Sequence, residues 1–451
     1  MIFWYSKRQI KIGLLFLFFF VASISFFIPP LQSPDEPAHL SRAYLLSKGE
    51  IFLGAADGVT GGKVDSGFLN YLDSFTYIHP KFPVKVDDER LETSRGIGWS
   101  NEDQFVGLPN TAAYFPISYA PQSIGIILGK SLDLSINQTY YLCRMASLVC
   151  ALALLFFALG LYAMPPLVIA CFLTPMTVFQ MGTASLDAVS FGLTTLAISL
   201  FMRGCNRSLT FTPFMHWSMT FLFFSIATTR LNFIFLTLLP AVLYFYRHSI
   251  WSIWQALLGF ILATSWGLFA LISIQGLTNA RSFSTIEIIR YYIQHPFEYF
   301  RVLFDTLRNR ELVASYWKGF IGHLGWADTL LNKHAYLIFF ALFLSLGLLT
   351  FKKITLKHHD RFRIFLFISL ILSFFSLFTI LLFAWSRHPT LFIEGIQGRY
   401  FIPFMILIGY GLFDKSLGKS DIKIIKLIFI FMSGVTLLST LHSLLNRYWL
   451  N

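Results

Sequence analysis

The sequence is poor in charged residues. Only 13% of its 451 residues are Asp, Glu, Lys or Arg, whereas soluble domains contain about a quarter. Hydrophobic residues make up 55%, with 51 Phe and 10 Trp, and the mean hydropathy is +0.63. Because the hydrophobic residues recur in long runs that are apolar on every face, the sequence excludes a soluble helical protein and predicts transmembrane helices.

Cysteine is scarce as well. The four cysteines are Cys143, Cys150, Cys171 and Cys205. They lie in or beside apolar runs and form no C-x-x-C pair, which excludes a disulfide framework and a zinc site. The chain also contains no internal repeat and no low-complexity tract. We therefore expect residues 1–451 to form one polytopic membrane domain.

The net charge of +12 does not indicate nucleic acid as a partner. Lys and Arg stand in short clusters between the apolar runs, which is the positive-inside pattern of membrane proteins. We expect membrane lipids as partners and no nucleic acid.

About eleven apolar segments are predicted to cross the membrane. Their approximate bounds are 12–27, 140–163, 165–183, 186–202, 213–229, 231–246, 252–275, 335–351, 363–386, 400–414 and 424–444. Lys7, Arg8 and Lys11 precede the first segment, which lacks the small-x-small site of a cleaved signal peptide. We therefore expect a retained first helix that enters the membrane from the cytoplasm.

A twelfth segment, 113–132, is long enough to cross but contains Pro116, Pro121 and Lys130. If it does not cross, most basic residues near the spans face the cytoplasm. These are Arg203, Arg207, Arg247, Lys352, Lys353, Lys357, Arg361, Arg363, Lys415, Lys419, Lys423 and Lys426. The short outer loops and the tail then hold only Arg230, Arg387, Arg399 and Arg447. The positive-inside rule thus favours an interfacial helix, and a re-entrant hairpin gives the same parity.

This topology leaves two large extracytoplasmic regions, 31–139 and 276–334. Each is too long to be a passive connector and is expected to carry function. The predicted fold is an all-α integral membrane protein with about eleven transmembrane helices and two large outer loops that bear interfacial helices.

Ionisable residues near the spans are unevenly placed. Mid-span positions are almost free of them. Those at the outer ends of spans are Asp35, Glu36, Arg144, Asp187, Arg230 and Arg399. Charges beside a bilayer are costly and mark function. A proton-coupled transporter keeps such groups near the midplane. Their position at one surface favours chemistry on a lipid-anchored head group at the outer interface.

Asp35 and Glu36 stand between Pro34 and Pro37, where the first span ends. The residue before a proline is biased toward an extended conformation, and proline suits the first turn of a helix. The two acids are then at a helix N-terminus, whose positive end favours ionised carboxylates. An ionised carboxylate can accept a proton from an attacking hydroxyl, which makes both acids catalytic candidates. The alternative is an interfacial acidic cap without catalysis.

Asp187 has two interpretations. It is either a second catalytic acid, including a ligand that holds a divalent metal together with Asp35, or a cap of the helix that begins at Ala188. His39 and Arg42 lie three residues apart on the helix after the acidic pair and share one of its faces. They are candidates for binding an anionic donor.

Two arginines are candidate phosphate ligands. Arg230 and Arg399 have the planar geometry that suits a phosphate group, and the alternative is interfacial snorkelling. Arg399 lies between Gly398 and Tyr400, and the glycine lets backbone and ligand approach closely. Tyr400 and Trp326 complete the candidate substrate-binding set, with loop packing as the alternative for Trp326.

Four stretches resemble a known family. Pro34-Asp35-Glu36-Pro37-Ala38-His39, followed by Arg42-Ala43-Tyr44, resembles the opening signature of a bacterial membrane-protein family catalogued as domain of unknown function 2142. Stretches similar to its later motifs are Leu173-Thr174-Pro175-Met176 with Ser185-Leu186-Asp187, Gly325-Trp326-Ala327-Asp328-Thr329, and Gln397-Gly398-Arg399-Tyr400-Phe401. That family looks like a branch of the GT-C glycosyltransferases.

The resemblance implies a multipass enzyme of the bacterial cytoplasmic membrane that uses a polyprenyl-phosphate sugar as donor. In GT-C enzymes an acidic motif in the first outer loop supplies the catalytic base, which maps onto Asp35 with Glu36 beside it. A second acid in the next outer loop maps onto Asp187. Basic residues at the outer face bind the lipid phosphate, and Arg230 and Arg399 are the matching positions.

The expected function is an inverting glycosyltransferase that transfers the sugar to a cell-envelope glycan or another acceptor on the extracytoplasmic face. Asp35 would take the proton of the acceptor hydroxyl. The alternatives are a flippase or transporter of lipid-linked glycans, a polymerase or ligase that uses a lipid-diphosphate donor, and a non-catalytic assembly factor for envelope glycans. A divalent metal at Asp35 and Asp187 stays open as a cofactor.

Overall fold

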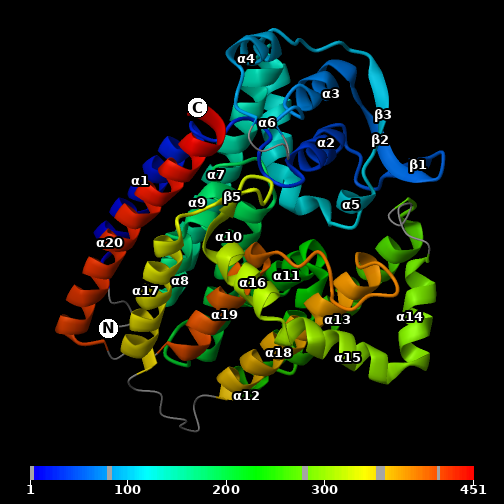
Figure 1. The fold of residues 1–451 in the computed structure, drawn as a ribbon. Helices are drawn as coiled ribbons and strands as arrows, with labels where there is room; N and C mark the ends of the chain where they lie inside the picture. Colours follow the sequence, from blue (N-terminus) through cyan, green and yellow to red (C-terminus); the bar gives the residue numbers. More distant parts are fainter. Residues whose placement is uncertain (1–4, 79–83, 277–282, 352–360, 414–416, 451) are drawn as a thin grey trace.

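The computed structural model describes residues 5–78, 84–276, 283–351, 361–413 and 417–450. Long helices form a bundle, and a layer of shorter helices and strands covers one end of it (Figure 1). By length and composition, seven helices in the described ranges can cross a membrane. They are α1 (Lys7–Ser25), α7 (Ile136–Leu161), α10 (Asp187–Cys205), α13 (Trp251–Ser273), α17 (Lys333–Phe351), α18 (Arg361–Ala384) and α20 (Lys419–Leu444). The chain is therefore an integral, multi-pass membrane protein.

The other four predicted spans are shorter or broken helices. They are α8 (Pro166–Phe172) with α9 (Pro175–Met181), α11 (Pro213–Thr229), the 3₁₀ helix η2 (Leu231–Leu243) with α12 (Tyr244–Arg247), and η4 (Gly398–Phe401) with α19 (Ile402–Leu412). The break between α8 and α9 falls at Thr174, which caps α9 by accepting the Thr177 N–H. Proline in the first turn of α9 cannot donate to the preceding helix. The number of eleven crossings stays a prediction.

One end of the bundle, which we call the basic end, gathers arginines. Its described members are Arg203, Arg207, Arg247, Arg361 and Arg363. Arg247 donates hydrogen bonds to the carbonyl oxygens of residues 203, 204, 206 and 209 at the end of α10. These carbonyls lie at the negative end of the helix, so the guanidinium stabilises that end. Lys352, Lys353, Lys357 and Lys415, which we predicted on the same side, lie outside the described residues.

The opposite end, which we call the capped end, carries a layer built from the first predicted outer region (Figure 1). Its helices are α2 (Glu36–Ser47), α3 (Ser66–Asp73), α4 (Asp88–Arg95), α5 (Pro109–Ala112), η1 (Pro116–Tyr119) and α6 (Ala120–Ser131). α10 begins with Asp187 at this end, and its 19 residues place the two ends about 28 Å apart.

The segment 113–132 contains α6, whose 12 residues span about 18 Å, less than the hydrocarbon core of about 30 Å. α6 lies against α7 at close range. A Cβ on Gly125 would come 3.0 Å from Cys143, and one on Gly129 would come 2.3 Å from Thr139. Its outer face exposes Ile124. This length and this exposed apolar face fit an interfacial helix.

The capped end also holds strands that an all-α prediction omits. β1 (Gly54–Ala56), β2 (Val59–Asp65) and β3 (Asp103–Gly107) form an antiparallel sheet in that order. Ala56 pairs with Val59, so Asp57 and Gly58 form a two-residue turn, and both have positive φ (50° and 73°). Asp-Gly is a preferred sequence for this turn. The signal was present in the sequence, and the expectation of a purely helical fold was incomplete.

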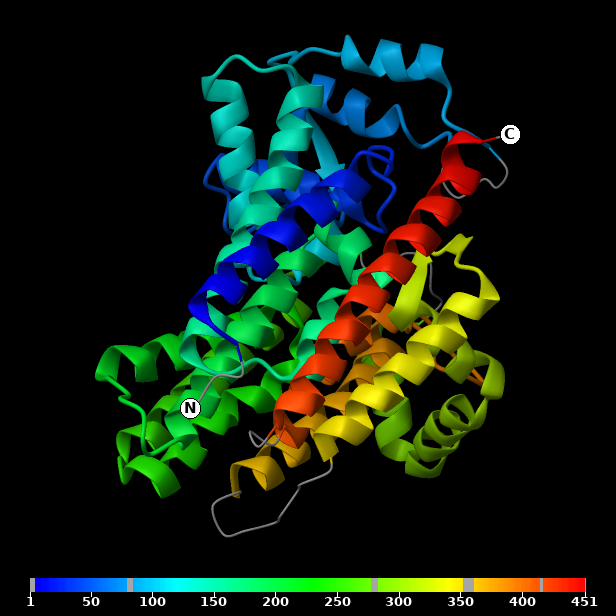
Figure 2. The same ribbon diagram turned by 90° about the vertical axis from the view of Figure 1, so that its left-hand side faces the viewer.

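The second predicted outer region folds as three helices and a short hairpin. They are α14 (Thr285–Gln294), α15 (Pro296–Arg308), α16 (Arg310–Gly322), β4 (His323–Leu324) and β5 (Thr329–Leu330). α15 exposes Phe297, Phe300 and Phe304 along one side. Such an unburied apolar stripe is typical of a helix that lies in the membrane interface. Figure 2 shows these yellow-green helices beside α17 and away from the layer on the capped end.

The end of α20 ties the layers together through η5 (Leu445–Trp449). Arg447 is buried, and its Nη2 lies 2.8 Å from an oxygen of Asp328 in the second outer region. It also donates to the carbonyl oxygens of Val84 at 2.7 Å and Ile78 at 3.1 Å in the first. One guanidinium therefore connects the two regions to the last helix.

Candidate functional site

The turn between α1 and α2 has an unusual backbone. Leu31 and Asp35 have φ values of 63° and 62°, in the left-handed region that bulky residues rarely adopt. The Tyr140 hydroxyl accepts the Leu31 N–H at 2.9 Å, and the Trp326 indole N–H donates to the Leu31 carbonyl at 3.0 Å. Because such a conformation persists only when its surroundings hold it, these two contacts fix the turn that presents the acidic pair.

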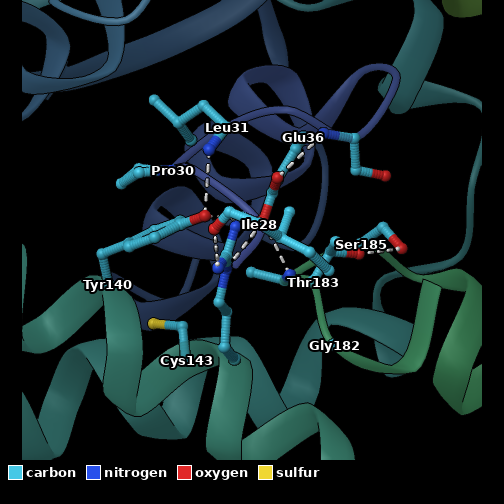
Figure 3. Close-up of polar contacts among 12 residues, drawn as sticks. Ile28, Pro30, Leu31, Glu36, Tyr140, Cys143, Gly182, Thr183 and Ser185 are labelled. Carbon is cyan, nitrogen blue, oxygen red and sulfur yellow. Dashed lines mark hydrogen bonds and ion pairs between the residues drawn. The ribbon is translucent and has the colours of Figure 1, made fainter. Parts of the chain in front are cut away.

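Glu36 is fully buried, and Figure 3 shows its polar contacts. Its Oε1 accepts the Ala184 N–H at 2.8 Å and the Tyr140 hydroxyl at 3.1 Å, and its Oε2 accepts the Ser33 N–H at 3.2 Å. The Arg144 Nε lies 3.6 Å from Oε1. The Glu36 carboxylate therefore joins the start of α2 to α7 and to the turn before α10, and it does not open toward the surface.

Arg144 extends this buried network to the end of α1. It donates to the carbonyl oxygens of Ser25 at 3.3 Å, Ile28 at 3.0 Å and Pro29 at 3.0 Å. These groups follow the last turn of α1, where carbonyls lack helical partners. Arg144 and Glu36 thus hold the chain on both sides of Asp35, at the end of α1 and at the start of α2.

Asp35 differs from its neighbour in exposure. Its side chain is 45% exposed, and it stands immediately before the first residue of α2. Its nearest cation is Arg399, whose Nη2 lies 3.8 Å from Asp35 Oδ2. At this distance the two groups form an ion pair and no hydrogen bond, so the Asp35 carboxylate keeps free acceptor positions.

Asp187 is buried and contacts two arginines. The Arg399 Nη1 lies 3.3 Å from Asp187 Oδ2, and the Arg230 Nη2 is paired with Asp187 Oδ1. The Arg230 Nε also donates to the Ser190 hydroxyl at 3.0 Å. α10 begins at Asp187 rather than Ala188, and the Asp187 side chain faces the arginines without capping the helix.

Asp35, Asp187, Arg230 and Arg399 form what we call the charged cluster. They come from four distant parts of the chain. Each lies in or next to the end of a helix, and all four meet at the capped end of the bundle. The two carboxylates balance the two guanidinium groups. α2 and α10 also direct their positive N-terminal ends to this point, so the local field favours an additional anion.

A divalent metal does not fit between Asp35 and Asp187. Both carboxylates already share the Arg399 guanidinium, and Arg230 occupies the other Asp187 oxygen. A metal ion there would be repelled by two cations within a few ångströms. Among the described residues, no three His, Cys, Asp or Glu side chains form a group that could hold a metal. We derive no step through a metal.

His39 lies beside the charged cluster on α2 and is buried. Its Nδ1 is 2.9 Å from the Tyr119 hydroxyl. Burial lowers the pKa of His39 to about 4, the carboxylates of the cluster oppose this shift, and its guanidinium groups add to it. The imidazole is therefore neutral at pH 7. It cannot bind an anionic donor through a positive charge, contrary to the expectation from the sequence.

The remaining predicted residues divide into two groups. The Tyr400 ring belongs with the cluster, since the guanidinium carbons of Arg230 and Arg399 lie 5.6 Å and 5.7 Å from its centre. Arg42 does not, because it donates to the carbonyls of residues 50 and 51 at 2.9 Å and 2.7 Å. Trp326 does not belong to the cluster either, because its indole N–H donates to the Leu31 carbonyl in the turn before Asp35.

Two participants were missed from the sequence. Ser190 lies three residues after Asp187 and shares its helix face, so helical spacing offered a signal for it. Arg144 was noted only as an ionisable residue at the outer start of a span. Its role as partner of Glu36 depends on tertiary packing, and no local pattern announces it.

The chain matches a known protein family. The model of a family described as predicted membrane protein (DUF2142) matches residues 18–408. No curated protein matches the chain. The matched stretch includes all four residues of the charged cluster.

Proposed function

The chain belongs to the DUF2142 family of predicted membrane proteins, and on this premise we propose that it is an inverting glycosyltransferase with a polyprenyl-phosphate sugar as donor. The observation that carries the proposal is the charged cluster. A half-exposed carboxylate and two arginines meet beside the ends of apolar helices. This combination supplies a base and an anion site at the depth of a lipid head group.

The proposed reaction is a single displacement. An acceptor hydroxyl attacks the anomeric carbon, and a new carbon–oxygen bond forms as the bond from that carbon to the phosphate oxygen breaks. The electron pair leaves with the lipid phosphate, and Asp35 takes the hydroxyl proton. General-base assistance of this kind contributes on the order of 10²–10⁴ in rate.

Arg230 and Arg399 would stabilise the departing phosphate, the electrostatic part of catalysis. Asp187 is a positioning residue in this scheme, because each of its oxygens faces one of the two guanidinium groups. Its charge keeps both arginines aimed at one point before the donor arrives. The incoming phosphate then takes up the hydrogen-bond donors that Asp187 leaves unused.

The proposal places the capped end outside the cytoplasm of a bacterial cell. Arginines of the basic end lie at the opposite ends of the same helices, and the positive-inside rule assigns that end to the cytoplasm. The N-terminal part of α1 lies there too, since the Tyr5 hydroxyl accepts the Met164 N–H just after α7. The acceptor would be a cell-envelope glycan or another extracytoplasmic hydroxyl.

The test is Asp35→Asn in vesicles that contain the purified protein and a panel of radiolabelled polyprenyl-phosphate sugars. We expect new glycosidic product to fall by about 10²–10⁴, with an unchanged thermal transition. Asp103→Asn is the matched control, because Asp103 is a half-exposed acid of β3 that pairs with Lys48. Full transfer by the Asp35→Asn protein would exclude Asp35 as the base.

The same vesicles separate the alternatives. When a lipid-diphosphate-linked glycan is added as a second donor, its consumption with release of the lipid diphosphate, and no transfer from the monophosphate donors, would identify a polymerase or ligase. Movement of labelled lipid across the bilayer without new glycosidic bonds would identify a flippase. An assembly factor would show neither glycosyl transfer nor lipid movement in the vesicles. In cells, its envelope glycans would be defective only on deletion of one of the two predicted outer regions. Each of these three results overturns the proposed reaction.

A further inference from the structure

An apolar groove runs along the bundle between α1, α7, α8 and α20. Its volume is about 490 Å³, and its walls include Leu14, Leu17, Leu155, Phe172 and Phe429. α1, α7 and α20 are among the helices long and apolar enough to cross a membrane. The groove is therefore at the depth of the lipid chains, where an apolar chain rather than water fills it.

Gly13 creates room in this groove. It lies inside α1 and lines the groove, and a Cβ built on it meets no atom within 4 Å. Glycine inside a helix costs roughly 1 kcal/mol relative to alanine. The open space beside Gly13 leaves a channel along α1 that a larger side chain would close.

The polar end of the groove is basic. Gln9 of α1 and Lys426 of α20 line it. Exposed cations follow on the same two helices, namely Arg8, Lys11, Lys419 and Lys423. Within the described residues of α1 and α20 the single carboxylate is Asp421, which accepts the Gly418 N–H. An anionic head group is therefore favoured at this end.

We propose that the groove binds one anionic phospholipid from the leaflet at the basic end of the protein. The lipid phosphate contacts the Lys426 amine beside Gln9, and one acyl chain runs past Gly13 toward Leu17. The helix N-termini of α1 and α20 lie at this end (Figures 1 and 2). The charged cluster is at the other end of the bundle, so this lipid is distinct from a donor with its head group there.

The test uses native mass spectrometry of the purified protein with phosphatidylglycerol or phosphatidylcholine added. We expect one phosphatidylglycerol to be retained in preference to phosphatidylcholine. Gly13→Leu should weaken retention of both lipids about tenfold or more. Gly347→Leu is the matched control, since Gly347 lies inside α17 and a Cβ on it also meets nothing within 4 Å.

Lys426→Gln tests the head-group contact and leaves the apolar residues that line the groove unchanged. It should abolish the preference for phosphatidylglycerol and keep chain binding, whereas Lys423→Gln should keep the preference. Unchanged retention in Gly13→Leu, or equal retention of the two phospholipids by the wild type, would refute the proposal. Displacement of phosphatidylglycerol from the wild type by a polyprenyl phosphate would also refute it, because the groove would then bind the donor lipid. None of these readings depends on glycosyl transfer.

Discussion

The two ends of the helix bundle use arginine differently. At the basic end Arg247 donates to four backbone carbonyl oxygens around the end of α10. At the capped end Arg230 and Arg399 face carboxylate side chains. A backbone partner is fixed by its helix, whereas a carboxylate can give up its share of a guanidinium to an incoming anion. The first arrangement stabilises the fold, and the second can bind a substrate.

The capped end itself contains both arrangements. Arg144 and Arg447 donate to carbonyl oxygens there, as the arginines of the basic end do. Position at the capped end therefore does not by itself make an arginine a candidate ligand. The distinguishing property of Arg230 and Arg399 is that both share Asp187 and lie beside the half-exposed Asp35.

The largest expected effect comes from removing the shared carboxylate. Asp187→Asn leaves the buried Arg399 and the partly buried Arg230 without their shared counter-charge, which should lower the free energy of unfolding by about 3–5 kcal/mol. Arg247→Gln removes contacts to fixed carbonyls and should cost about 1–2 kcal/mol. Thermal unfolding of both proteins in the same detergent measures the difference. Equal losses would show that the two ends do not differ in the way described.

The next effect concerns His39, the neutral ring beside the cluster. Its pKa is lowered to about 4 by burial, while an unfolded histidine titrates near 6.5. As pH falls from 6.5 toward 4 the unfolded state binds the additional proton, so stability falls by roughly 1.4 kcal/mol per pH unit in that window. Above pH 6.5 the residue contributes no pH dependence.

The measurement compares thermal transitions of the wild type and His39→Gln between pH 7 and pH 5. The wild type should lose more stability than the variant over this range. His295→Gln is the control, because His295 is an exposed residue between α14 and α15. Parallel curves for the wild type and His39→Gln would contradict a neutral buried His39.

The smallest effect tests the support of the motif. Trp326→Phe removes the indole hydrogen bond to the Leu31 carbonyl and should cost about 1 kcal/mol. Trp266→Phe removes an equivalent bond to the Ala113 carbonyl, at 2.9 Å, with a similar cost. We expect glycosyl transfer to decline only in Trp326→Phe, because, of the two indole bonds, only that of Trp326 reaches the turn before Asp35. Equal transfer rates in the two variants would separate Trp326 from the site.

Much of the architecture was predictable because a transmembrane helix requires a long apolar stretch, which is visible in the local sequence. Every predicted span contains helix in the structure where it is described, although four of them are short or broken, since lipid leaves backbone groups few other partners. The small sheet was missed because its strands are short and polar. Its Asp57-Gly58 turn was the available signal, and no apolar alternation flanks it.

The sequence predicted which residues gather in the candidate site better than it predicted their contacts. Counting charges at span ends selected Asp35, Asp187, Arg230 and Arg399 without any tertiary information. The sequence did not predict that Glu36 is buried while Asp35 is exposed. This difference arises because α2 begins at Glu36 while Asp35 takes a left-handed backbone. That choice depends on Tyr140, Arg144 and the turn before α10. Local sequence likewise placed Arg42 on the face of His39, but its partners are carbonyls that α2 meets only after folding.

The contact of Arg447 with Ile78 has a consequence for biogenesis. These two residues are 369 positions apart, so the ribosome has released the first outer region long before the guanidinium that closes it exists. Until α20 is inserted, the carbonyls of Ile78 and Val84 and the Asp328 carboxylate lack their buried partner. The layer at the capped end is thus completed last, and a nascent chain halted before α20 would leave these buried groups without their partner.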